Sequence, residues 1–182
     1  MKYDELIQLI SSRHSCRNYL EKDIPDELIE KCLEASRLAP SACNKQPWRF
    51  IVVKDAELRG SICREGILPG LPMPWLKKVP VIIAICAKTE FITHKLAKFI
   101  SKVDYSPIDI GIAGEHFVLA AESLGLGSCW IGWFKAKAIK RILNIPRNIK
   151  VVSLLSLGYP TNKNTGKKEK LMLSDIYSKN RW

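Results

Sequence analysis

Closely spaced metal ligands are missing from this chain of 182 residues. Its six cysteines include no C-x-x-C pair, and its three histidines lack the spacing of metal ligands. Structural zinc sites and iron–sulfur clusters depend on such close spacing. The sequence therefore predicts no metal site, and the cysteines are expected to be ordinary small apolar residues.

The first residues of this sequence are not apolar, and the sequence has no long uninterrupted apolar run. Residues 1–5 are charged and lead directly into an amphipathic helix, so we expect no signal peptide. The most apolar stretch, residues 108–124, is interrupted by Asp109, Glu115 and Glu122, which is typical of a buried helix and not of a membrane span. We therefore expect a cytoplasmic protein with reduced thiols and no membrane partner.

Acidic residues are scarce in the last third of the chain. From residue 125 to residue 182, twelve Lys and Arg residues face only Glu169 and Asp175, so this third carries +10 of the formal net charge of +11. Such a surface can steer an anionic ligand or bind nucleic acid, although a solvated basic face is commoner. Nucleic-acid binding also predicts aromatic residues among the basic ones, whereas Trp130 and Trp133 lie in an apolar, Gly-rich loop. Nucleic acid is therefore not the expected partner.

The length and a hydrophobic content of 47% suffice for one compact domain over residues 1–182. Apolar spacing, prolines and caps, with Asp4 as the first cap, predict helices at residues 4–12, 25–39, 55–64, 107–124 and 135–143. Short apolar runs predict strands at residues 50–53, 81–87, 129–131 and 151–157. This order of elements indicates an α+β fold with few strands and several helices.

Three further segments have less regular patterns. Residues 66–80 contain four prolines, which predicts a loop or lid outside the core. Residues 90–102 are compatible with a helix. Residues 161–182 are polar and basic, so we expect this tail to be either disordered or laid across a partner.

The helix predicted at residues 107–124 is apolar nearly all the way round, and Gly125 is expected to end it. A helix of this composition needs cover on most of its sides. A position in the core together with a subunit interface would supply that cover.

Two short segments carry the residues best suited to bind a ligand. Residues 13–17 combine two arginines with a serine, and a guanidinium fork, a hydroxyl and backbone N–H groups together match a phosphate. Residues 40–48 form a proline-bounded loop that carries the carboxamides of Asn44 and Gln46. Each carboxamide donates and accepts hydrogen bonds, as the edge of a heterocycle requires. Together the two segments predict a mononucleotide-like cofactor.

These segments resemble those of the nitroreductase family, the FMN-dependent NAD(P)H oxidoreductases. Residues 13–17 (RHSCR) resemble the family's N-terminal phosphate motif, and residues 40–48 (PSACNKQPW) are similar to its P-S-x-x-N-x-Q-P-W segment. Residues 109–132 resemble the long dimer-interface helix and the loop over the flavin. Residues 158–160 (GYP) and 168–170 (KEK) resemble the closing segment. The resemblance implies a nitroreductase-like fold, with a mostly antiparallel sheet flanked by helices in an intertwined homodimer.

The resemblance also implies roles for single residues. Arg13 and Ser15, with two lysines near the C-terminus, would hold the FMN phosphate, while Arg17 and Asn44 would reach the edge of the flavin ring. No side chain is expected to act as a catalytic acid, because the hydride chemistry belongs to the cofactor. The full set of expected FMN contacts is Arg13, His14, Ser15, Arg17, Pro40, Ser41, Ala42, Asn44, Gln46, Trp130, Ile131, Gly132, Lys168 and Lys170.

The activity that the resemblance implies is reduction of FMN by NADH or NADPH, followed by transfer of the electrons to a small-molecule acceptor. Nitroaromatics and quinones are the expected acceptors, in a ping-pong sequence. Similar proteins use the same flavin site for dehalogenation, ene reduction or flavin breakdown, and these stay open as alternatives. Two residues depart from the family's pattern: Lys170 replaces a common Arg and so offers a point charge, and Trp133 replaces a common second glycine.

Overall fold

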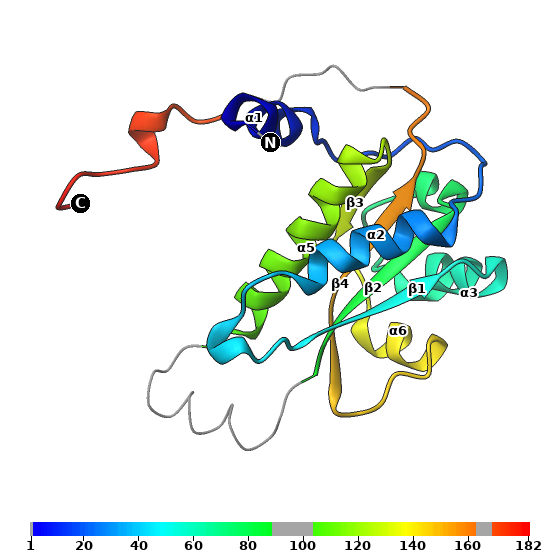
Figure 1. The fold of residues 1–182 in the computed structure, drawn as a ribbon. Coiled ribbons are helices and arrows are strands. Elements are labelled where there is room, and N and C mark those ends of the chain that lie inside the picture. Colours follow the sequence, from blue (N-terminus) through cyan, green and yellow to red (C-terminus); the bar gives the residue numbers. More distant parts are fainter. Residues whose placement is uncertain (1, 89–103, 163–168) are drawn as a thin grey trace.

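The computed structural model describes residues 2–88, 104–162 and 169–182 (Figure 1). Its helical elements are α1 Tyr3–Ser12, α2 Asp26–Arg37, η1 Ala42–Asn44, α3 Ala56–Ser61, η2 Ile62–Gly66, η3 Pro74–Lys78, α5 Ser106–Ser123, α6 Ala136–Ile142 and η4 Leu173–Asp175. Its strands are β1 Trp48–Val53, β2 Val81–Lys88, β3 Gly127–Ile131 and β4 Ile149–Gly158. The predicted α+β class is confirmed, and the helix predicted within residues 90–102 lies outside the described residues.

The four strands form one sheet in the order β1-β2-β4-β3, in which every neighbouring pair is antiparallel. β2 lies in the middle, where Ala84 pairs with Ile51 of β1 and with Leu154 of β4. All residues of β2 except Lys88 are buried. The central, doubly covered strand predicted from its continuous apolar run is therefore confirmed.

Helices cover both faces of this sheet. On one face α2 and α5 pack against the strands, and Phe117 of α5 belongs to the same core cluster as Ile83 of β2. On the other face lie α6, η2 and η3, where Ile62 and Leu76 share a second cluster with Ile82. Because successive residues of a strand point to opposite faces, Ile82 and Ile83 serve the two clusters separately. Figure 1 shows α2 and α5 lying side by side along one face of the sheet.

The helix α5 has one buried side and one exposed side. On the buried side, a Cβ added at Gly114 would lie 2.2 Å from the ring of Trp130, so only glycine fits there. On the exposed side, Ile108 keeps 51% of its accessible surface, and a Cβ added at Gly111 would meet nothing within 4 Å. The prediction that one side of this helix packs in the core is therefore confirmed. The subunit interface on its other side stays a prediction. None of the helices in the described ranges has the length and apolar character that a bilayer crossing requires.

The first helix begins differently from the prediction. The cap position is Lys2, and its backbone N–H donates to a carboxylate oxygen of Glu5 at 2.9 Å. A side chain three residues into a helix can reach back to the cap in this way, whereas Asp4 lies too early in the first turn. The prediction that Asp4 caps the helix is therefore wrong.

The proline-rich segment 66–80 belongs in part to the core, which corrects the prediction of a loop outside it. Pro74 begins the short helix η3, and the turn places Leu76 and Val79 in the interior, at 1% and 0% exposure. Proline favours the first turn of a helix because its fixed φ suits that position. This proline-rich segment thus contains a short helical turn whose buried side chains pack beneath the sheet.

The two ends of the chain lie away from the sheet. None of the residues of α1 is buried, and residues 169–182 extend beyond α1, away from the main body (Figure 1). The described part of the tail lies outside the core and, among its polar and basic residues, exposes a set of large apolar side chains. These are Leu171, Met172, Leu173, Ile176, Tyr177 and Trp182.

Candidate functional site

The segment 13–17 runs from the end of α1 past the start of β3. The backbone N–H of Cys16 donates to the Ser128 carbonyl at 2.9 Å, and Ser15 forms a parallel bridge with Ser128. Cys16 is buried, Ser15 is half-buried and Arg17 is exposed. Because neighbouring side chains of an extended backbone point to opposite sides, burial of Cys16 directs Ser15 and Arg17 away from the core.

Arg13 follows the last turn of α1 and lies against α5. Its Nε is 4.0 Å from Oε1 of Glu115, and the two side chains are 26% and 47% exposed. An ion pair of this exposure contributes about 0–1 kcal/mol. The guanidinium is therefore held near α5 yet can exchange the carboxylate for a phosphate. Next to it, Nδ1 of His14 lies 3.2 Å from the Ser12 carbonyl.

The loop 40–48 is anchored at the first turn of α5. The backbone N–H of Ala42 donates to Oδ1 of Asp109 at 3.0 Å, and Asp109 is only 5% exposed. Within the loop, the hydroxyl of Ser41 accepts the Gln46 N–H at 2.9 Å. Hydrogen bonds to a charged acceptor are stronger than those between neutral groups, so the buried carboxylate fixes the start of the loop.

Three residues of this loop adopt left-handed backbone conformations. The φ angles are 51° at Cys43, 52° at Asn44 and 47° at Gln46. Such angles are uncommon outside glycine and persist where surrounding contacts hold them. Nε2 of Gln46 donates to Oδ1 of Asn44 at 2.9 Å, and both side chains are exposed. The two carboxamides therefore orient each other on the surface.

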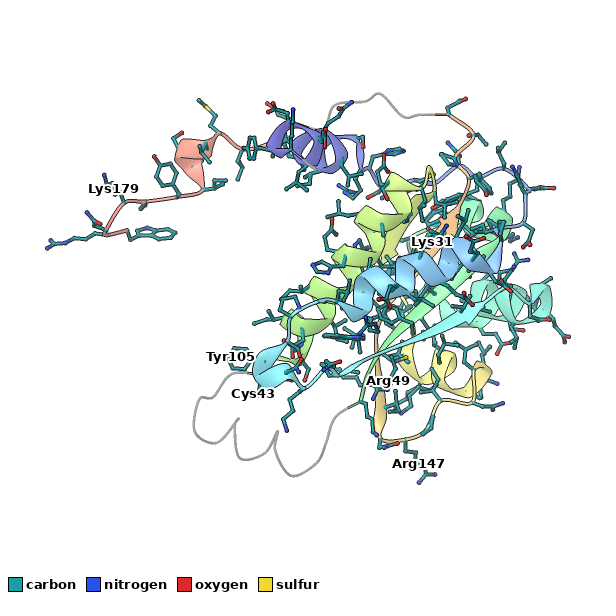
Figure 2. The ribbon with its side chains drawn as sticks, viewed as in Figure 1. Lys31, Cys43, Arg49, Tyr105, Arg147 and Lys179 are labelled. Atoms are coloured by element: carbon teal, nitrogen blue, oxygen red, sulfur yellow. The ribbon has the colours of Figure 1, made fainter. Side chains whose placement is uncertain are left out.

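The segment 13–17 and the loop 40–48 lie near opposite ends of α5. Figure 2 places Cys43 beside Tyr105, at the start of the helix, whereas α1 lies at its other end. From Asp109 to Ser123 the helix rises roughly 21 Å. The backbone at Ser15 and Cys16, which bonds to β3 just beyond the helix, is thus separated from the carboxamides by most of the length of α5.

The predicted contacts at the end of β3 differ in exposure. Trp130 is half-buried with its ring over Gly114, Ile131 is buried, and Gly132 is exposed as the strand ends. Trp133 follows at 44% exposure, and its Nε1 donates to the Pro69 carbonyl at 3.1 Å. The residue that replaces the common glycine therefore ties the proline-rich segment to the end of β3.

The predicted contact residues can now be placed by exposure. Lys168 lies outside the described residues, and its role stays a prediction. The exposed contacts are Arg17, Pro40, Asn44, Gln46, Gly132 and Lys170. The half-buried contacts are Arg13, His14, Ser15, Ser41, Ala42 and Trp130, and Ile131 is buried.

The buried cysteines have the properties of core residues. Burial raises the pKa of Cys32 to about 12 and that of Cys86 to about 11, and it raises the pKa of Cys16 as well. These thiols therefore stay protonated at neutral pH and are poor nucleophiles. Across residues 2–88, 104–162 and 169–182, no group of His, Cys, Asp and Glu side chains is arranged to hold a metal ion.

Sequence reasoning missed three residues that hold these segments in place. Asp109 anchors the loop 40–48, and its only signal was a carboxylate within an apolar helix. The hydroxyls of Tyr19 and Ser156 form a buried pair at 2.7 Å that joins the segment 13–17 to β4. A serine in an apolar strand is the single hint of that pair, because its two members are 137 residues apart.

Comparison with known proteins shows to which protein family this chain belongs. The profile described as "Nitroreductase family" matches residues 10–71 and 64–159. The chain belongs to this family. The resemblance found in the motifs is therefore confirmed, and so is the predicted class of fold.

Three relatives show the range of this family around the chain. A protein of Archaeoglobus fulgidus named "Putative NADH dehydrogenase/NAD(P)H nitroreductase" is 40% identical over 164 residues, 88% of each chain. The solved structure of an FMN-dependent nitroreductase from Clostridium difficile R20291 is 28% identical, with a TM-score of 0.76, and the match covers 97% of this chain and 99% of that one. Iodotyrosine deiodinase 1 of Sus scrofa is 28% identical over 185 residues, 88% of this chain and 63% of the relative.

Proposed function

We propose that this nitroreductase-family protein is an NAD(P)H-dependent flavin oxidoreductase that binds FMN. In this proposal it is a cytoplasmic enzyme, residues 1–182 form one domain, and nitroaromatics, quinones or similar molecules are the acceptors. Family membership carries the proposal. The names of the archaeal relative and of the clostridial structure support NAD(P)H and FMN as the redox partners.

The side chains of the segment 13–17 and of the loop 40–48 suit the two ends of FMN. Arg13 and Ser15 offer a guanidinium and a hydroxyl outside the core, where a phosphate can reach them. Asn44 and Gln46 offer donors and acceptors on an exposed, rigidly held loop, as the polar edge of a flavin ring requires. The donor set of the described residues therefore fits the cofactor.

The separation of the two backbone segments, one bonded to β3 and the other to the first turn of α5, supports a site shared by two copies of the chain. In the proposed C2 homodimer, residues 13–17 of one subunit hold the phosphate, and the loop 40–48 of the other reaches the ring. The exposed side of α5, with Ile108 and Gly111, would then be covered by the partner. The exposed apolar set of the C-terminal tail also suits burial against a second copy, because large apolar patches on a monomer are rare.

The protein's part in the reaction is binding, orientation and electrostatics. When bound, FMN supplies the hydride chemistry between NAD(P)H and the acceptor. Arg13 neutralises the phosphate, while Arg17 and the Asn44 carboxamide donate toward the ring edge, where they would stabilise negative charge. The basic C-terminal third raises the local concentration of the anionic reductant. A single pocket used in turn by donor and acceptor leads to ping-pong kinetics.

Absorbance of the purified protein tests this function. We expect a yellow protein with flavin bands that NADH or NADPH bleaches without oxygen and that a quinone or nitroaromatic restores. Double-reciprocal plots at several acceptor concentrations should be parallel. Bound flavin that neither nicotinamide bleaches would refute the reductase proposal and favour the specialised flavin reactions of the family, such as that of the deiodinase relative.

A further inference from the structure

Tyr19 is a buried residue that the roles above do not use. It is 4% exposed, and its hydroxyl lies 2.7 Å from the Cys16 carbonyl and 2.7 Å from Oγ of Ser156. A carbonyl only accepts, so the Tyr19 hydroxyl donates its proton to Cys16 and accepts from Ser156. Two short hydrogen bonds thus run in one direction from β4 to the segment 13–17, in an interior where each strengthens the other.

The bond to the Cys16 carbonyl also sets the direction of the Arg17 N–H. These two groups belong to one planar peptide, and the described peptide bonds are all trans. In a trans peptide the N–H points opposite to the carbonyl. Since the carbonyl points to the buried Tyr19 hydroxyl, the Arg17 N–H points away from it. It lies in the same short segment as the Ser15 hydroxyl and can donate to an anion that binds there.

The ring of Tyr19 has little freedom to move. A Cβ added at Gly158 would lie 2.6 Å from Cδ1 of Tyr19, so the ring packs directly on the backbone where β4 ends. The ring of Trp75 lies beside it with centroids 6.3 Å apart, and the Tyr19 backbone bridges Pro160. Packing against the end of β4 therefore fixes the position of the Tyr19 hydroxyl. The hydrogen bond from this hydroxyl in turn fixes the direction of the Cys16 carbonyl.

We propose that Tyr19 is a positioning residue for the cofactor phosphate. Its hydroxyl holds the Cys16–Arg17 peptide in the orientation that turns the Arg17 N–H away from Tyr19, where it can donate to the phosphate. Tyr19 itself does not touch the ligand. This inference rests on the proposed function, because it takes the phosphate of FMN as the anion.

Comparing FMN with riboflavin isolates this role, because the two flavins differ only in the phosphate. Tyr19→Phe removes the hydroxyl and keeps the packing of the ring. We expect the dissociation constant of FMN, measured by flavin fluorescence at fixed protein concentration, to rise about tenfold, while that of riboflavin changes less than about twofold. Ser156→Ala removes the donor behind Tyr19 and should shift the same ratio in the same direction by less.

A matched control is Ser36→Ala. Ser36 is also fully buried, and its hydroxyl donates to the Cys32 carbonyl at 3.1 Å within α2, so both flavins should bind as to the wild type. An unchanged FMN-to-riboflavin ratio in Tyr19→Phe and Ser156→Ala would overturn the inference, and so would an equal loss of both flavins. A wild-type protein that binds neither flavin would instead overturn the proposed function.

Discussion

At the scale of single residues, the segment 13–17 shows how one buried side chain determines which of its neighbours are exposed. Cys16 is 3% exposed, and its thiol packs so closely on Gly127 that a Cβ there would lie 2.7 Å away. This contact fixes which side of the backbone faces the core. Arg17 is therefore left on the outside with a charge that the core could not accept. The candidate site is cationic because the uncharged thiol of Cys16 takes the buried side of the segment and leaves Arg17 on the exposed side.

Arg13 provides the most direct test at this scale. Arg13→Ala should weaken FMN binding by about 2–5 kcal/mol, at least about thirtyfold, because a charged bidentate partner of the phosphate is lost. Arg147→Ala removes the same charge from an exposed residue that Figure 2 places near the turn between α6 and β4, far from α1, and it should leave binding unchanged. Flavin content after purification and titration with FMN measure both effects. An Arg13→Ala protein that purifies with a full complement of FMN would exclude Arg13 as the main phosphate ligand.

At the scale of elements, the anchored loop 40–48 makes a second prediction. Asp109→Ala removes the acceptor of the Ala42 N–H, a bond to a charged group whose loss costs about 1.5–3 kcal/mol of folding free energy. The left-handed residues of the loop then lose part of the support that holds them. We expect a lower melting temperature together with weaker FMN binding.

Asp109→Asn is the matched variant, because its side-chain oxygen can still accept the Ala42 N–H. It should keep most of the FMN affinity that Asp109→Ala loses. Equal affinities for FMN in the wild type and in Asp109→Ala would show that this anchor does not serve the cofactor.

The sequence predicted the elements well where their signals are local. The buried run of β2 and the end of α5, where Gly125 has a φ of 73°, were evident from single stretches of sequence. The buried helical turn at Leu76 was missed because proline signals a loop and a helix start alike. The motifs named the candidate site residues, but the partners that hold them, such as Ser156 for Tyr19, are distant in sequence and so leave no local pattern.

At the scale of the whole molecule, three exposed features have one explanation. The outer side of α5, the helix α1 and the apolar set of the tail all leave large apolar side chains in solvent. The backbones of the segment 13–17 and of the loop 40–48 are meanwhile attached near opposite ends of α5. A second copy of the chain would cover the apolar surfaces and complete the site at the same time, so assembly and cofactor binding should be lost together.

A substitution at Gly111 distinguishes the proposed homodimer from a monomer. It lies on the exposed side of α5 with nothing within 4 Å of an added Cβ, so Gly111→Glu causes no clash within one chain. In a monomer the substitution should raise the free energy of unfolding by about 0.5–1 kcal/mol, because glycine weakens a helix interior. In the proposed homodimer the buried carboxylate should instead break the interface, giving a monomer by light scattering that has lost FMN. Lys137→Glu places a carboxylate on α6, against the opposite face of the sheet, and should leave the dimer intact. A more stable, flavin-loaded Gly111→Glu protein would remove α5 from the interface.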